Sequence, residues 1–163
     1  MNTTEVTEAA QPIQLTPEVS QLQKLKVLVG EWRGEGLSYE NGKETPTTAR
    51  DTFEWLAGEH FLIHRWDWVI GEGTQFQGLE MMGYNEDRHM FFATMYDNAG
   101  HKVSYDVLLK DDVFTYHGEY AGHLHRAKLS VSHDGQTLTD KWHTSEDGKT
   151  WKPLCDLKWN KLS

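Results

Sequence analysis

From residue 31 onward, short stretches of alternating apolar and polar residues are separated by tight-turn signals. Such alternation is typical of antiparallel strands that bury one face. Ten strands are predicted, at residues 31–39, 48–56, 59–69, 75–84, 88–96, 102–109, 113–118, 123–132, 137–144 and 150–160. Because only short turns join them, they predict an all-β, antiparallel, up-and-down arrangement. Closure into a barrel is favoured, since it leaves no exposed edge; a two-sheet sandwich is the alternative.

The segment before the first strand predicts a short helix that plugs one end of this barrel. Thr16 and Pro17 are typical of a helix start. Apolar residues then recur at helical spacing: Val19, Leu22, Leu25 and Leu28. Gly30 allows the chain to turn sharply, and the large indole of Trp32 is expected to fill the closed end.

Length, charge and composition narrow the class of protein. The 163 residues predict one domain over residues 17–163, preceded by a flexible tail over residues 1–16, which show no periodicity. A formal charge of −9 argues against nucleic acid as a partner. A mean hydropathy of −0.68, with no long apolar run, argues against a membrane.

The location and assembly of the chain are also constrained. No signal-peptide pattern is found at the N-terminus. The single cysteine, Cys155, fits a reducing compartment and is expected to be a small buried residue. These features predict a cytoplasmic protein, and a homodimer stays open as its assembly state.

Several motifs resemble known barrel families. Gly30-Glu31-Trp32 resembles the Gly-x-Trp mark of the lipocalin and fatty-acid-binding (calycin) group. Later stretches resemble an uncharacterised bacterial family, domain of unknown function 1579: residues 54–58, 61–65, 83–85, 96–100, 142, 145–151 and 156. This resemblance covers nearly the whole chain after residue 19. It implies a lipocalin-like barrel and supplies no established activity.

The opening motif, residues 30–36, is also similar to the nitrobindin family, which implies a ten-stranded barrel that holds haem through one histidine. In that family the histidine that binds the haem lies in the last strands. The matching region here, residues 153–157, contains no histidine, and His143 lies one strand earlier. Haem is therefore an alternative rather than the expectation, and no cofactor is expected.

The densest polar and aromatic stretch predicts one wall of a ligand pocket. On a strand, His64, Trp66 and Trp68 point to one face and Arg65 and Asp67 to the other. A register slip of one residue would exchange the two faces. Other polar or aromatic candidates for the pocket are Glu80, Tyr84, Tyr96, Tyr105, Arg126 and Trp142. A mostly apolar cavity with a few such groups predicts binding of a small, partly apolar molecule.

Histidines on later strands suggest a second kind of site. His123 and His125 share one strand face, roughly 6.6 Å apart. If residues 119–122 form the preceding turn, His117 lies across from His123. Three converging imidazoles would suit zinc; the alternative is that they are exposed surface residues.

Two further classes of function remain open. A barrel enzyme could use His64 as an acid or base, or the His117, His123 and His125 group as metal ligands. An interaction protein without an internal ligand would instead have an interior packed solid with side chains. The sequence contains no phosphate loop, nucleophile elbow, CxxC or HExxH motif.

Overall fold

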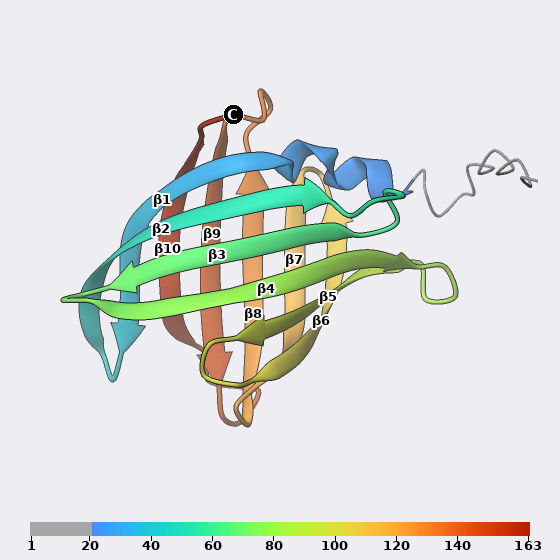
Figure 1. Cartoon of the computed structure of the whole chain (residues 1–163). Coiled ribbons are helices and arrows are strands. Elements are labelled where there is room, and N and C mark those ends of the chain that lie inside the picture. Colours follow the sequence, from blue (N-terminus) through green and yellow to red (C-terminus); the bar gives the residue numbers. More distant parts are fainter. Residues whose placement is uncertain (1–20) are drawn as a thin grey trace, which may run out of the picture.

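A closed antiparallel barrel is the architecture of this chain (Figure 1). The structure, a computed structural model, describes residues 21–163. The strands are β1 (Gly30–Glu40), β2 (Lys43–Trp55), β3 (Leu62–Ile70), β4 (Thr74–Asn85), β5 (Met90–Asp97), β6 (Lys102–Lys110), β7 (Val113–Tyr120), β8 (His123–Val131), β9 (Thr137–Ser145) and β10 (Lys152–Lys161). Each pairs with its sequence neighbours, and β1 closes against β10. The ten-stranded, up-and-down barrel is confirmed, and the sandwich alternative is wrong.

The largest difference from the predicted strand ends is at β2. This strand begins at Lys43 rather than at residue 48, so a stretch that resembles a loop in sequence is paired with β1. Pro46 lies within it, opposite Leu37. Proline has no N–H to donate, and it is tolerated in a strand where its nitrogen needs no partner. Its carbonyl still accepts a hydrogen bond from the Gly71 N–H at 2.8 Å.

Two glycines allow the first and last strands to approach closely. Gly34 lies opposite Trp159, and Gly36 lies opposite Leu157. A Cβ on Gly34 would lie 2.6 Å from the Trp159 ring, and a Cβ on Gly36 would overlap the Asp156 carbonyl. Gly34 therefore leaves room for the buried indole of Trp159, and Gly36 lets the backbone of β10 approach where the barrel closes.

The segment before β1 is a short 3₁₀ helix, η1 (Gln23–Leu28), over the described residues. The predicted helix start at Thr16 and the predicted tail lie outside them. Three leucines of this segment are fully buried: Leu22, Leu25 and Leu28. The Trp32 indole N–H donates to the Leu28 carbonyl at 2.7 Å, and Lys161 donates to the Val27 carbonyl at 3.2 Å. These bonds fix η1 against the ends of β1 and β10.

The barrel interior has two unlike ends. Because the strands run antiparallel, the starts of β1, β3 and β7 and the ends of β4 and β10 share the end that η1 joins. Large side chains are fully buried there, among them Trp32, Leu62, Met82, Phe114 and Trp159. Toward the opposite end, inward positions carry polar groups as well as rings. Among the described residues, no helix is long and apolar enough to cross a membrane.

We predict that Trp32→Phe lowers the free energy of unfolding by about 1–3 kcal/mol. The change removes the hydrogen bond to the Leu28 carbonyl and leaves a gap beside the buried leucines. Urea unfolding measures the effect, with Trp151→Phe on the partly exposed surface as the matched control. Equal losses in the two variants would contradict a special role for Trp32.

Candidate ligand-binding site

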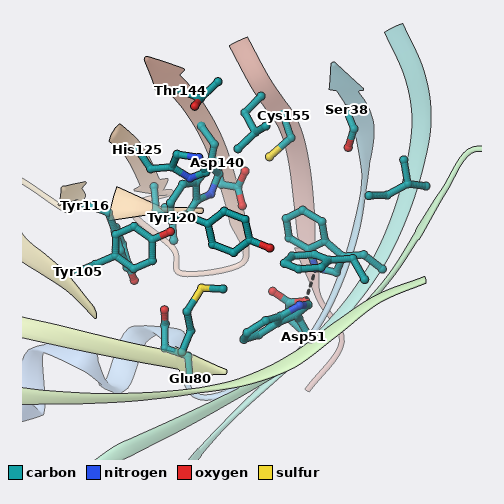
Figure 2. Close-up of a pocket in the computed structure, with 18 of the residues that line it drawn as sticks. Ser38, Asp51, Glu80, Tyr105, Tyr116, Tyr120, His125, Asp140, Thr144 and Cys155 are labelled. Carbon is teal, nitrogen blue, oxygen red and sulfur yellow. Dashed lines mark hydrogen bonds between the residues drawn. The ribbon is translucent and has the colours of Figure 1, made fainter. Parts of the chain in front are cut away.

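A cavity of about 540 Å³ lies in the barrel interior, toward the end away from η1. Aromatic rings form much of its wall: Phe53, Trp66, Trp68, Phe76, Tyr105, Tyr116, Tyr120 and Trp142. Figure 2 shows Asp51 and Glu80 on one wall and Asp140 on the facing wall. This volume and this mixture of many rings with a few polar groups are typical of small-molecule sites.

Three neighbouring strands place an imidazole between two carboxylates. In the register, His64 of β3 lies opposite Phe53 of β2 on one side and opposite Glu80 of β4 on the other. The His64 Nε2 atom is 2.8 Å from an Asp51 carboxylate oxygen. The Nδ1 atom is 3.4 Å from a Glu80 oxygen. Both ring nitrogens therefore face acceptors, which suits the doubly protonated imidazolium.

Further contacts hold this group in place. The Phe53 ring stacks on His64 with centroids 4.1 Å apart and planes 6° apart. The Trp68 indole N–H donates to the second oxygen of Asp51 at 2.9 Å. Burial lowers the His64 pKa, but the Asp51 charge and the hydrogen bonds to both carboxylates outweigh it and raise that pKa to about 10. His64 is therefore protonated at neutral pH.

Asp140 on β9 is a second buried acid in the cavity wall. It is 4% exposed, and within the described part of the chain its Oδ1 atom has no hydrogen-bond partner. Burial, with a further contribution from the charge of Asp51, raises the pKa of Asp140 to about 8. At neutral pH this side chain is therefore mostly a neutral acid that can donate a hydrogen bond into the cavity.

A hydrogen-bonded cluster lies at the cavity mouth. The Tyr120 hydroxyl donates to Asp97 at 2.7 Å and lies 3.0 Å from a His101 nitrogen. The Tyr120 ring also stacks on His125, with centroids 5.3 Å apart. Burial, with the nearby His123 contributing, lowers the His125 pKa to about 4, so its imidazole is neutral at neutral pH. The cluster connects the β5–β6 and β7–β8 turns.

The structure brings six of the predicted pocket residues into the cavity wall: His64, Trp66, Trp68, Glu80, Tyr105 and Trp142. The predicted positions of Tyr96 and Arg126 are wrong. Their neighbours Met95 and His125 point inward, so these two side chains point outward. Tyr96 is 48% exposed, and Arg126 lies over the Trp151 ring at 4.1 Å.

Tyr84 is also absent from the cavity wall. It lies near the end of β4, at the barrel end that η1 joins. Its ring packs edge-on against Phe91 with centroids 5.0 Å apart. Tyr84 therefore contributes to packing at that end.

The predicted three-histidine metal site is wrong because the β7–β8 turn is shorter than expected. Tyr120 pairs with His123, which leaves His117 opposite Arg126. His117 is exposed, because its neighbour Tyr116 points inward. His123 and His125 do line the cavity, but within residues 21–163 no three His, Cys, Asp or Glu side chains are placed so that they could hold a metal ion together.

The last strands do not offer the histidine that the nitrobindin resemblance implies for haem. Strand β10 contributes Leu154 and Cys155 to the cavity wall. His143 lies between the inward-pointing Trp142 and Thr144 and so points outward. The residues present therefore do not fit that mode of haem ligation. Cys155 is buried, as predicted.

Two buried acids of the cavity wall, Asp51 and Asp140, are not among the residues predicted from the sequence. Both occupy inward positions of an alternating strand: Asp51 lies between Ala49 and Phe53 on that face, and Asp140 between Leu138 and Trp142. The signal that could have identified them is an acidic residue at a strand position where the alternation otherwise places apolar, inward-facing residues.

The closed barrel with its ring-lined cavity is a lipocalin-like fold, and this class is defined by fold alone. Within that class, the chain belongs to the family described as Protein of unknown function (DUF1579), whose family model matches residues 18–152. No curated protein matches the chain.

Two solved structures share the fold. The S-type phycobiliprotein lyase CPES from Guillardia theta has 10% sequence identity and a TM-score of 0.64, over 90% of this chain and 93% of that one. Rv2717c from M. tuberculosis has 15% identity and a TM-score of 0.65, over 92% of this chain and 100% of that one. At these identities the likeness shows a common fold.

We predict that Asp140→Asn removes part of the pH dependence of stability. The folded protein keeps the Asp140 proton up to about pH 8, whereas the unfolded chain loses it near the ordinary value of 3.8. The free energy of unfolding therefore falls as pH rises between these values. Asparagine cannot ionise, so the variant should be more stable than wild type by about 1–3 kcal/mol at pH 8 and similar to it near pH 4.

Urea unfolding across this pH range measures the difference. Asp87→Asn, in the exposed β4–β5 turn, is the matched control and should follow the wild-type curve. An Asp140→Asn curve parallel to wild type would show that Asp140 ionises normally.

Proposed function

We propose that this protein binds a small, partly apolar organic molecule inside its barrel. The observation that carries the proposal is the cavity of about 540 Å³, lined by aromatic rings and a few buried polar groups. A barrel packed solid would have argued for a purely structural role. The S-type phycobiliprotein lyase of Guillardia theta uses a similar barrel, and this likeness supports a role that involves a ligand.

The two ends of the barrel suggest a direction of entry. We place η1 as the closure of one end, because its buried leucines and the Trp32 hydrogen bond lie there. The ligand then enters at the other end, past Tyr120, His123 and Thr144. The cytoplasmic location, the homodimer and the absence of nucleic-acid and membrane partners remain predictions.

The enzyme alternative based on His64 as a general base has less support. Both ring nitrogens face carboxylates, and the His64 pKa is raised to about 10. A general base needs an unprotonated nitrogen that can accept a proton, and therefore a pKa close to the pH at which the enzyme works. His64 instead serves better as a fixed positive charge that organises Asp51 and Glu80.

The test is uptake of the neutral fluorescent probe N-phenyl-1-naphthylamine. We expect its emission to increase and shift to the blue with wild-type protein, because the probe leaves water for an apolar cavity. Thr144→Trp should weaken binding at least tenfold, because Thr144 lines the cavity and a large ring there takes up the space.

Thr139→Trp is the matched control. It places the same ring on the outer face of β9, since Leu138 and Asp140 point inward. Absence of probe uptake by folded wild-type protein, or equal uptake by the two variants, would contradict binding inside the barrel.

A further inference from the structure

The cavity wall carries an uneven set of charges. Four acidic side chains line it, from Glu40, Asp51, Glu80 and Asp140, against the imidazoles of His64, His123 and His125. No lysine or arginine among residues 21–163 contributes to the wall. Burial raises the pKa of Asp51 and of Asp140, but acidic side chains still outnumber basic ones in the wall.

The acids differ in how far their hydrogen bonding is satisfied. Both oxygens of Asp51 have donors, from His64 and Trp68. Glu80 has only the long 3.4 Å contact with His64 among the described residues. Asp140 is more than nine-tenths buried, and its Oδ1 atom has no partner in that part of the chain. Buried polar groups left in this state are costly unless a ligand supplies the partner.

Aromatic faces surround the acids. The Trp66 ring lies 5.5 Å from the His64 ring and 5.6 Å from the Phe76 ring. Tyr105 and Tyr116 also line the wall, with centroids 6.1 Å apart. Ring faces attract cations through their quadrupole, and a carboxylate beside them strengthens that preference in a site shielded from water.

We propose that the cavity selects an organic cation: a protonated amine on an aromatic or apolar body, with its ammonium group at the Glu80 carboxylate. This inference rests on the proposed function and names the chemical class of its ligand. The amine donates to Glu80, the rings enclose the body, and Asp140 on the facing wall partners a further polar atom. The ammonium group places a positive charge beside Glu80, in a wall to which no lysine or arginine of residues 21–163 contributes.

The acidic side chains of the cavity wall also disfavour ligands that carry a negative charge. A carboxylate or phosphate ligand would meet Glu80 with no lysine or arginine of residues 21–163 in the wall to offset the repulsion. Burying an unpaired charge next to a like charge is strongly unfavourable. Fatty acids and other carboxylate ligands are therefore disfavoured despite the apolar wall.

The test compares three ligands with the same ring and different charge, by calorimetric titration at pH 7. They are 1-naphthylmethylamine (cation), 1-naphthylmethanol (neutral) and 1-naphthylacetate (anion). We expect the amine to bind at least tenfold more tightly than the alcohol, and the acetate to bind most weakly. Binding of the alcohol or the acetate as tightly as the amine would overturn the inference.

A pair of variants assigns the preference to the site. Glu80→Gln keeps the shape and removes the charge, and it should reduce the ratio of amine to alcohol affinity about tenfold. Glu35→Gln removes the same charge from the exposed face of β1 and should leave that ratio within twofold. Equal shifts in both variants would overturn the role of Glu80. Circular dichroism verifies folding, and the wild-type comparison decides the question if Glu80→Gln does not fold.

The neutral probe separates this inference from the proposed function. Uptake of N-phenyl-1-naphthylamine without preference for the amine overturns the cation inference alone. Failure of the probe and of all three ligands to bind overturns both.

Discussion

A positive charge inside a barrel has to be balanced by negative charges held close to it, and the interior of this protein is built on that constraint. His64 lies between Asp51 and Glu80, which come from the two strands flanking its own. Removing either carboxylate would leave a buried charge poorly compensated. Phe53 stacks on His64 and Trp68 donates a hydrogen bond to Asp51, so this group also fixes the position of two rings of the cavity wall.

The width of the barrel explains why the group formed by Asp51, His64 and Glu80 can face an open cavity. Ten strands enclose a wider interior than the eight of a small barrel that side chains can fill. At the η1 end, Trp32 and Trp159 are fully buried, and Gly34 provides the room that the Trp159 ring needs. At the other end the inward side chains stop short of one another, and a cavity remains. The apolar end supplies packing, which allows the other end to carry polar groups.

Strand positions and one cavity wall could be predicted from the sequence, because both follow from alternation alone. The inward face of β3, with His64, Trp66 and Trp68, is an example. Tyr96 and Arg126 were misplaced because residue type suggested a pocket where their position in the alternation points them outward. His117 was misplaced because a two-residue turn changed the pairing.

The acids were harder to predict, because charged residues in strands usually face water. Asp51 and Asp140 become identifiable only when their phase with apolar neighbours is given more weight than their charge. The closing contact between β1 and β10 joins the two ends of the sheet. Local sequence pattern contains no information about such a distant pairing, so the packing role of Gly34 and Gly36 emerged from the structure alone.

The most direct test of this account is the protonation state of His64, measured from the ¹⁵N chemical shifts of its ring by NMR. We expect both nitrogens to stay protonated at pH 8, with a titration midpoint near the pKa of about 10. Asp51→Asn should lower that midpoint, because the carboxylate that stabilises the imidazolium is removed. A neutral His64 at pH 8 in the wild-type protein would contradict the charge arrangement on which the proposed site depends.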